Sequence, residues 1–542
     1  MTHPSASSLV ASPSPVKADN RVARVLARIE ARPKLAALLL GVAAATGFTP
    51  LGLWLVTLVA IGLFAWTVFR APSWKAAGAR GWFFGMGHFT LANNWIAHAF
   101  TYQDNMPHAL GWLAVPLLSV YLAVYPAIGA MLAKLLQRHV SLAWFAPLFA
   151  GCWAISEWLR SWVFTGFAWD PLGLALLGSF ERPGIALILP WFGTYALSGI
   201  VALLGTVLIA LILHTRIMAA GAVVAGLALA MYLPAPGEEI GTVAFTLIQP
   251  DLRQEELNDA AQFEGQFLRA ASLSVKRRDV TRRVVLWPES GVPDYLRDGY
   301  PQRYYDRMTA GGDPAFARYR LGRVAGEGGM LLTGAVDLEI ADGRAYAARN
   351  SVTAIDETGA IVAGYDKAHL VPYGEYLALR WLLEPLGATR LVAGALDFLP
   401  GPGPRTLDLG DWGRVGVQIC YEIVFSGQVV DRDDRPEYIF NPSNDGWFGD
   451  FGPPQHLAQA RMRAIEEGLP VLRSTTTGIS AVIDANGVVR SHIGRHYPAR
   501  IDGLIPPAKP PTLFARLGNF LPMAWAILAI ILSLVATRKR RS

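Results

Sequence analysis

Eight long apolar runs are the feature that most limits how this chain can fold. They cover residues 35–48, 51–69, 81–100, 109–133, 142–159, 192–213, 217–233 and 520–536. Most approach the roughly 20 residues that a helix needs to cross the hydrocarbon core of a bilayer. Hydrophobic residues make up 52% of the chain and charged residues only 17%, too apolar a composition for one soluble enzyme of 542 residues. The chain is therefore expected to contain a membrane domain.

The segment FTPLG, residues 48–52, decides how many spans this domain has. A tight hairpin there separates the first two runs, whereas a kink would join them into one long helix. With a hairpin, alternation of the spans gathers most basic residues on one side of the membrane. These residues are Arg21, Arg24, Arg28, Arg32, Lys34, Arg70, Lys75, Arg80, Lys134, Arg138, Arg216 and the RKRR tail at 538–541. The short loops on the other side hold chiefly Arg160 and Arg182.

Because basic loops stay in the cytoplasm, this asymmetry predicts eight spans with both termini cytoplasmic. The basic residues lie beside apolar runs, so the net charge of +6 indicates a membrane surface and no nucleic-acid partner. We expect a disordered arm at 1–30, seven spans within 31–236, and the eighth helix with a basic tail at 507–542. A cleaved signal peptide at 35–48 is disfavoured because further spans follow at once.

Residues 241–505 lack any run of membrane length and hold many short β-like segments, with helix-like stretches at 254–278 and 455–467. This pattern predicts an α/β domain, placed at 237–506 between spans seven and eight. By the charge argument it faces away from the cytoplasm, which in a bacterium means the oxidising periplasm. The two cysteines, Cys152 and Cys420, exclude a disulfide framework, and Cys152 lies in an apolar run where packing is its expected role.

Cys420 stands where an alternating strand pattern, GRVGVQI, ends and a turn or helix begins. A thiol becomes a good nucleophile only as a thiolate, so it needs a base or a positive charge nearby. Two other strand ends offer such groups, since Glu289 follows RVVLWP, and Lys367 and Glu375 follow a further apolar stretch. Glu289, Lys367 and Cys420 would meet if their strands are neighbours in one sheet.

The order of these three residues carries a resemblance to a known family. The contexts WPES, YDKAHLVPYGEY and CYE, followed by NPSNDGWFG, resemble the nitrilase, or carbon–nitrogen hydrolase, superfamily. With the surrounding spans and the segment SEWLRSWVFTGFAW at 156–169, the chain resembles the apolipoprotein N-acyltransferase family. The resemblance implies a helical membrane domain of eight spans and a nitrilase-like αββα sandwich inserted between spans seven and eight.

The resemblance also implies the catalytic roles. Glu289 is expected to act as the general base, Lys367 to stabilise the oxyanion and Cys420 to form a thioester. Further residues are expected to support the site or to line it and its entrance: Glu375, Tyr421, Glu422, Trp447 and Phe448. One departure is Gly446, which stands where Ala is common and for which we expect no loss of activity.

The implied reaction moves an acyl chain from a phospholipid to the N-terminal amine of the S-diacylglyceryl-cysteine of an apolipoprotein. Lifting a sixteen-carbon chain into water would cost about 10 kcal/mol at roughly 0.8 kcal/mol per methylene, so the spans are expected to form part of the lipid site. The implied location is the bacterial inner membrane, and the implied state is a monomer. No cofactor is expected, and no metal, because the histidines lack metal-ligand spacing.

Other interpretations stay open. Cys420 alone would be an ordinary buried thiol, and His369 could replace Glu289 and Lys367 as the partner of a Cys–His dyad. The pair Glu157 and Arg160 could neutralise itself or lie near the lipid path. The same catalytic set could use water, giving a membrane-tethered amidase or esterase, and a non-catalytic lipid-binding scaffold is the remaining alternative.

Overall fold

The computed structural model describes residues 20–102, 109–137, 141–257, 259–276, 280–386 and 396–538. Residues 1–19 of the predicted arm and residues 539–542 of the basic tail lie outside this part of the chain. Residues 20–30 differ from the expected disordered arm, because they belong to helix α1 (Asn20–Ala31). The side chains of Leu26 and Ile29 pack against the helical core, which gives this segment a reason to be ordered.

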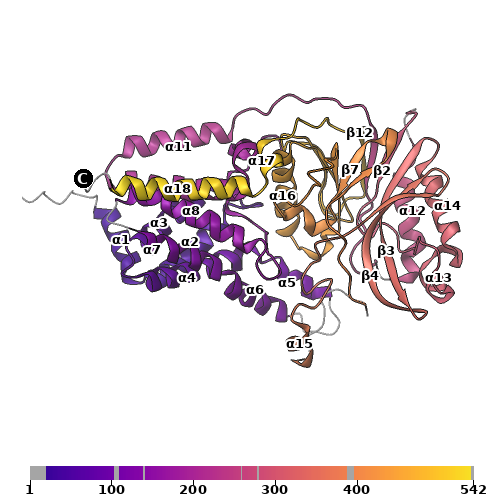
Figure 1. Cartoon of the computed structure of the whole chain (residues 1–542), viewed down its shortest axis with the longest axis horizontal. Coiled ribbons are helices and arrows are strands. Elements are labelled where there is room, and N and C mark those ends of the chain that lie inside the picture. The colour runs from indigo at the N-terminus through magenta and orange to yellow at the C-terminus, as the bar shows by residue number, and fades with distance from the viewer. Residues whose placement is uncertain are drawn as a thin grey trace, which may run out of the picture.

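Apolar helices occupy each of the eight predicted runs and gather at one end of the molecule (Figure 1). They are α2 (Pro33–Ala45), α3 (Trp54–Phe69), α4 (Trp74–Ala92), α6 (Ala109–Leu122) with α7 (Val124–Leu136), α8 (Leu142–Arg160), α10 (Thr194–Leu213), α11 (Ile217–Met231) and α18 (Phe520–Arg538). Within the described residues, three helices are long and apolar enough to cross a membrane: the rod 109–136, α8 and α10. Four others, α2, α3, α11 and most of α18, are apolar but shorter.

The FTPLG segment is a hairpin, as predicted. Helices α2 and α3 are separate and pack against each other. The Leu53 N–H donates to the Thr46 carbonyl (2.9 Å), and the Thr57 hydroxyl donates to the Ala44 carbonyl (2.7 Å). These bonds satisfy backbone groups at the helix ends, which a turn without side-chain caps would otherwise leave unpaired. A kinked single helix is thereby excluded.

Short helices link the spans on the side that meets the rest of the chain. They are α5 (Ile96–Ala99), η1 (Phe100–Tyr102), η2 (Leu172–Leu176), η3 (Ile185–Ile188) and α9 (Leu189–Phe192). After the last sheet strand, α17 (Leu513–Leu517) leads into α18. The loop between α8 and η2 is held by Arg160, whose guanidinium donates to the carbonyls of Phe167 (2.9 Å) and Trp169 (2.7 Å).

The segment between α11 and α17 folds into two six-stranded sheets. One has the order β12-β1-β2-β3-β4-β5, and the other has the order β11-β10-β9-β8-β7-β6. Their strands are β1 (Ala244–Gln249), β2 (Arg283–Leu286), β3 (Gly329–Ala341), β4 (Arg344–Asp356), β5 (Ile361–Asp366), β6 (Thr406–Asp408), β7 (Arg414–Val417), β8 (Tyr438–Ser443), β9 (Val471–Thr475), β10 (Ser480–Ile483), β11 (Val489–Ile493) and β12 (Ala499–Leu504).

Each sheet has three parallel strands at its centre: β1, β2 and β3 in the first, and β7, β8 and β9 in the second. Apolar side chains of both sheets meet between them in one core, including Leu247 and Leu286 from the first and Val415 and Val417 from the second. The outer face of the first sheet is covered by α12 (Phe263–Leu273) and α14 (Pro314–Ala325). The remaining short elements are η4 (Ala260–Gln262), α13 (Gln302–Met308), η5 (Ala310–Gly312), α15 (Arg380–Leu383), η6 (Glu384–Leu386), η7 (Gly410–Trp412), η8 (Cys420–Val424) and η9 (Asp445–Trp447).

Helix α16 (Gly452–Glu467) covers the second sheet and lies between it and the apolar helices (Figure 1). The layers therefore follow the order helix, sheet, sheet, helix, which is the expected αββα sandwich. Every residue of α16 from Gln455 onward is buried, although many are polar. Arg461 donates to the carbonyls of Gly178 (2.8 Å) and Ser179 (2.5 Å), so this helix joins the sandwich to the helical domain.

Candidate active site

The three candidate catalytic residues follow strands whose carboxyl ends lie at one edge of the sandwich. Glu289 comes after β2, Lys367 directly after β5, and Cys420 after β7. Strand β5 runs in the same direction as β2 because two antiparallel pairings separate them. The three strands are not neighbours in one sheet, which differs from the expectation: β3 and β4 separate β2 from β5, and β7 belongs to the facing sheet. The packing of the two sheets, and not strand pairing alone, brings together groups that lie 131 residues apart in sequence (289 to 420).

Lys367 lies between two carboxylates. Its ammonium nitrogen is 2.9 Å from Glu375 Oε1 and 3.6 Å from Glu289 Oε1, and all three side chains are buried. The side-chain amide of Asn350 joins the two acids, donating to Glu289 Oε1 (2.7 Å) and to Glu375 Oε1 (2.9 Å). Buried charges persist only when paired and hydrogen-bonded, and this arrangement meets both conditions. The expected proximity of Glu289, Lys367 and Glu375 is therefore present in the structure.

Cys420 occupies a sharp turn at the end of its strand. Its φ is +52°, in the left-handed region that non-glycine residues rarely adopt, and such a conformation costs on the order of 1–3 kcal/mol. Helix η8 begins at this residue, and the thiol is buried with 6% of the residue exposed. The sequence pattern predicted a strand end followed by a turn or helix, which the structure confirms.

Asn444 connects the thiol with Glu289. Its backbone N–H donates to Glu289 Oε2 (2.8 Å), and the same backbone opposes the rise in the pKa of the Cys420 thiol. Strand β8, which precedes Asn444, pairs in parallel with β7, which precedes Cys420. The backbone of Asn444 thus links the carboxylate of Glu289 with the turn that carries Cys420, and a carboxylate held in this way can act as a proton acceptor.

The surroundings raise the pKa of both the Cys420 thiol and the Lys367 ammonium, so the first stays neutral and the second stays charged. Burial and the negative charge of Glu289 raise the pKa of Cys420 well above its usual value, although Lys367 and Asn444 oppose this. Burial lowers the pKa of Lys367, but the carboxylates of Glu375 and Glu289 outweigh burial and raise it above its usual value. At neutral pH the site therefore holds a thiol that needs a base and a permanent cation beside it.

Glu422 ties the cysteine turn to the segment that follows Lys367. Its Oε1 accepts the Tyr365 hydroxyl (2.8 Å) and the N–H groups of Ala368 (2.8 Å) and His369 (3.1 Å). Its Oε2 accepts the N–H of Ile419 (2.8 Å). Burial raises the pKa of Glu422 to about 7, opposed by these backbone hydrogen bonds. The Glu422 side chain therefore orders the site by binding the backbone next to Lys367 and Cys420.

Aromatic side chains of both domains border the site. The Tyr421 ring stacks at 6.5 Å on Trp169, which follows α8, and the Phe448 ring meets Trp95 at 4.7 Å. Trp447 contacts Tyr102 edge to face at 5.6 Å. The expected lining residues Tyr421, Trp447 and Phe448 therefore face the helical domain. A substrate held by that domain would meet the catalytic edge of the sandwich here.

Several residues that order the site were not among the sequence predictions. Asn350 carries no signal in the sequence, because it lies in an ordinary strand pattern and acts only through contacts across the sheet. Asn444 and Asp445 stand inside the quoted NPSNDGWFG segment, so a role could have been assigned to them. His456 was considered only as a metal ligand, yet its Nε2 lies 3.0 Å from the backbone carbonyl oxygen of Cys420.

The alternative residues have other surroundings. The His369 ring lies on Phe425 with centroids 3.6 Å apart, and burial lowers its pKa to about 4. In the described part of the chain, no hydrogen bond joins this ring to the Cys420 sulfur, which disfavours a Cys–His dyad. Glu157 and Arg160 form the expected ion pair at 3.9 Å. Cys152 packs inside the helical core, in agreement with a structural role.

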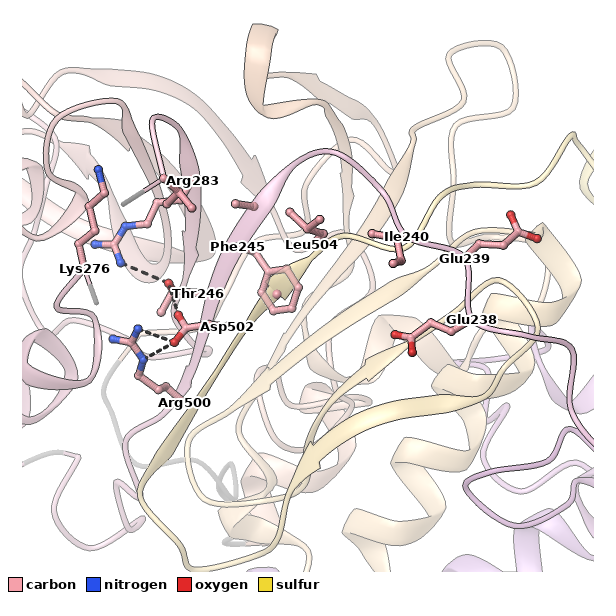
Figure 2. Close-up of a pocket in the computed structure, with 13 residues that line it drawn as sticks. Glu238, Glu239, Ile240, Phe245, Thr246, Lys276, Arg283, Arg500, Asp502 and Leu504 are labelled. Atoms are coloured by element: carbon pink, nitrogen blue, oxygen red, sulfur yellow. Dashed lines mark hydrogen bonds and ion pairs between the residues drawn. The ribbon is translucent and has the colours of Figure 1, made fainter. Parts of the chain in front are cut away.

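A cavity of about 300 Å³ lies elsewhere, along β1 and β12 (Figure 2). Its charged side chains serve the fold, since Arg500 pairs with Asp502 and donates to the carbonyl of Leu273 (2.9 Å) at the end of α12. Arg283 donates to the Ser274 carbonyl (2.7 Å) at the same helix end. Cationic groups stabilise helix carboxyl termini, so these arginines have a structural explanation.

Comparison with known proteins agrees with this arrangement. The family described as "Apolipoprotein N-acyltransferase N-terminal domain" matches residues 40–207, and "Carbon-nitrogen hydrolase" matches residues 246–496. The apolipoprotein N-acyltransferases of Rhodopseudomonas palustris and Bradyrhizobium diazoefficiens are each 33% identical to this chain, over 93% of it and 95% of each relative.

Among solved structures, a carbon–nitrogen hydrolase from Helicobacter pylori is 14% identical, with a TM-score of 0.34 over 48% of this chain and 88% of that one. The sequence relatives alone decide the family, because they match both domains over nearly their whole length. A helical domain with apolar helices of membrane type is followed by a carbon–nitrogen hydrolase sandwich with a cysteine at its catalytic edge. The chain therefore belongs to the apolipoprotein N-acyltransferase family.

Proposed function

We propose that this membrane enzyme transfers an acyl chain from a phospholipid to the N-terminal amine of the S-diacylglyceryl-cysteine of an apolipoprotein, through a thioester on Cys420. The observation that carries the chemistry is the Glu289–Lys367 pair, 3.6 Å apart, joined through Asn444 to a strained and buried cysteine. The relatives named apolipoprotein N-acyltransferase support the choice of donor and acceptor.

In the first half-reaction Glu289 accepts the proton of the Cys420 thiol. The sulfur attacks the carbonyl carbon of the phospholipid ester, and the C=O electron pair moves to the oxygen. When this intermediate collapses, the C–O bond to the glycerol breaks and Glu289 returns the proton to the leaving alkoxide. The products are a thioester and a lysophospholipid. A base is required because the raised pKa keeps the resting thiol protonated.

The oxyanion formed in this step needs donors that are already in place. Lys367 is an ammonium held by Glu375, whose Oε1 also accepts from Asn350, and the backbone N–H of Tyr421 follows the nucleophile directly. Fixed donors in a site without bulk water stabilise developing charge without reorganising, and a single one is worth about 10²–10³ in rate. Glu375 accordingly supports the reaction through Lys367, and Glu422 through the backbone before Cys420 and after Lys367.

In the second half-reaction the neutral amine of the acceptor attacks the thioester. Glu289 accepts a proton from the attacking nitrogen and delivers it to the departing sulfur, so the C–S bond breaks as the C–N bond forms. The free thiol is restored and the acceptor gains an amide. Water would give a fatty acid instead, and the aromatic border of Tyr421, Trp447 and Phe448 facing the helical domain favours a lipid acceptor over water.

The proposal includes a topology. All eight apolar helices or helix pairs span the bacterial inner membrane, both termini are cytoplasmic, and the sandwich lies in the periplasm between spans seven and eight. The helices α2, α3, α11 and α18 are short, which tilt and local thinning of the bilayer accommodate. Every proposed catalytic group comes from one chain, so the working unit is a monomer with no nucleic acid and no cofactor in the reaction.

The test uses purified enzyme in detergent or vesicles with an acyl-labelled phospholipid. Without acceptor, label is expected on Cys420 as a hydroxylamine-sensitive thioester, and an S-diacylglyceryl peptide with a free amine should then take the label as an amide. An amine-blocked peptide of the same sequence is the matched control and should take none. Steady release of labelled fatty acid at the same rate with and without acceptor would instead identify a hydrolase.

A further inference from the structure

His456 touches the backbone of the nucleophile from the opposite side of the site. It lies on α16 and is fully buried, with its Nε2 3.0 Å from the carbonyl oxygen of Cys420. A carbonyl oxygen only accepts hydrogen bonds, so Nε2 carries the hydrogen and donates it. Neither the family resemblance nor the sequence motifs pointed to this contact.

Two buried side chains hold the other edge of the imidazole. His456 Nδ1 lies 3.0 Å from Asp445 Oδ1 and 3.0 Å from an Nη2 nitrogen of Arg473. The same Nη2 reaches both oxygens of Asp445, at 2.8 and 2.7 Å. Burial and the charge of Arg473 lower the pKa of His456, opposed by Asp445 and the Cys420 carbonyl. Because Nδ1 faces the Arg473 donor and Nε2 faces a carbonyl acceptor, the neutral ring carries its hydrogen on Nε2. The donor toward Cys420 is therefore fixed in tautomer and direction.

The carbonyl of Cys420 and the N–H of Tyr421 belong to one peptide unit. That unit is planar and trans, so its C=O and N–H point in opposite directions and cannot turn independently. A hydrogen bond that fixes the carbonyl also fixes the N–H. In the described part of the chain, no hydrogen-bond acceptor meets the Tyr421 N–H, which leaves this donor available to a substrate atom.

We propose that His456, held by Asp445 and Arg473, is a positioning residue that aims the Tyr421 N–H at the acyl oxyanion by anchoring the Cys420 carbonyl. The inference rests on the proposed acyl transfer and adds a residue to it. His456 touches neither substrate nor sulfur. It keeps the strained left-handed turn of Cys420 in the one orientation that points the N–H into the site.

The position of His456 on α16 extends this role to the helical domain. The preceding residue, Gln455, accepts the indole N–H of Trp169 (2.9 Å) and donates to the Ala92 carbonyl (3.2 Å). Two successive residues of one rigid helix thus hold the aromatic border of the helical domain and the catalytic peptide of the sandwich. Helix α16 therefore contacts both the peptide that carries the oxyanion donor and the aromatic border of the helical domain.

The experiment compares single-turnover acylation of Cys420 by labelled phospholipid in the wild type, His456→Leu and His456→Gln. Leucine fills similar space without a donor, whereas the glutamine amide can present an N–H at about the reach of Nε2. The Leu variant should lose about 10²-fold or more in the acylation rate constant, and the Gln variant should stay within about 10-fold of wild type. The phospholipid concentration for half-saturation should stay unchanged, because the oxyanion exists only in the transition state.

Ile465→Ala is the matched control, since Ile465 is a buried residue of the same helix that faces the helical core. It should lower Tm but leave the acylation rate of folded protein at the wild-type value. A folded Leu variant that acylates at the wild-type rate overturns the inference, and so does a folded Gln variant as slow as Leu. If Leu fails to fold, Gln alone decides. Absence of label on wild-type Cys420 would instead reject the acyl-transfer proposal itself.

Discussion

The chain carries two free, buried cysteines in very different regions. Cys152 lies in the middle of α8 with 1% of the residue exposed, packed among apolar side chains of the helical core. Cys420 has 6% exposed, a φ of +52°, and the charges of Glu289 and Lys367 beside it. Burial and the lack of a disulfide are common to both. What distinguishes the nucleophile is therefore the convergence of an acid, an ammonium and a strained turn.

The surrounding domains differ in the same way. In the helical domain the described ion pair between Glu157 and Arg160 fixes a loop, with Arg160 bound to backbone carbonyls. In the sandwich, Glu289 and Glu375 pair with Lys367 beside the buried Cys420 thiol. Desolvating charges costs several kcal/mol each unless geometry and hydrogen bonds compensate. In the sandwich the buried charges lie at the proposed active site, whereas in the helical domain they hold the loop after α8.

The largest expected effect separates the two cysteines directly. Cys420→Ala should abolish thioester formation and lower acyl transfer by about 10⁴-fold or more, because deletion of a covalent nucleophile removes the whole route. Cys152→Ala should change the transfer rate less than about twofold and cost only about 1 kcal/mol of stability. Both are measured by transfer of labelled acyl chains to a diacylated peptide. Equal loss in the two variants would remove the distinction between the regions.

The second prediction concerns the base. Glu289→Gln should slow Cys420 acylation by about 10²–10⁴-fold, because no group then accepts the thiol proton. The same change should shift the alkylation of Cys420 by iodoacetamide to lower pH. The negative charge of Glu289 disfavours the thiolate, so its removal lowers the thiol pKa.

The pH profile of Cys420 alkylation, followed by mass spectrometry with Cys152 as the internal control, checks the sign of this shift. The Cys152 profile should be the same with either residue at 289. If the Cys420 profile moves to higher pH, or if both cysteines shift together, the charge at 289 does not act on the nucleophile in the way the geometry indicates.

The third prediction tests the cation. Lys367→Met keeps the length of the side chain but removes the charge, and should slow acylation by about 10²–10³-fold through loss of one oxyanion donor. The carboxylates of Glu289 and Glu375 would then lie close together without a cation between them, so Tm should also fall. Acylation rate and Tm are measured on the same preparation. An unchanged acylation rate in folded Lys367→Met would show that the ammonium serves the fold alone.

Much of this site could be predicted from the sequence, for reasons that particular residues make clear. Glu289, Lys367 and Cys420 each follow a strand pattern, and the ends of parallel strands are where such side chains gather. The sequence did not show that β7 belongs to a second sheet packed on the first. Asn350 could not be found in this way, because its contacts with Glu289 and Glu375 exist only once β4 has paired with β3 and β5 in the sheet. His456 was missed for the same reason, since it acts through a backbone carbonyl 36 residues away.

The fold shows the same division. The apolar runs predicted the positions of the helices, because length and hydropathy are local properties of the sequence. The distribution of basic residues predicted the FTPLG hairpin. The arm was different, since helix α1 is ordered by Leu26 and Ile29 packing against the core of the helical domain. The buried polar helix α16 also follows from tertiary context, because its arginines and glutamates are bonded to segments of both domains. Contacts between residues that are far apart in sequence produce no periodic pattern, so they could not be predicted from the sequence.

The smallest expected effect lies in the helical domain and involves stability without chemistry. Helices α3 and α10 approach so closely that a Cβ on Gly62 would lie 2.1 Å from the Gly205 carbonyl oxygen. Gly62→Ala should therefore force the helices apart and cost about 1–3 kcal/mol, a loss of several degrees in Tm. Gly221→Ala in α11 is the matched control, because nothing lies within 4 Å of its added carbon and alanine favours the helix by about 0.5–1 kcal/mol. Both variants should acylate Cys420 at the wild-type rate when folded. A slow but folded Gly62→Ala protein would mean that helix packing in the membrane domain reaches the nucleophile, and the separation between a structural and a reactive region would have to be replaced by one coupled unit.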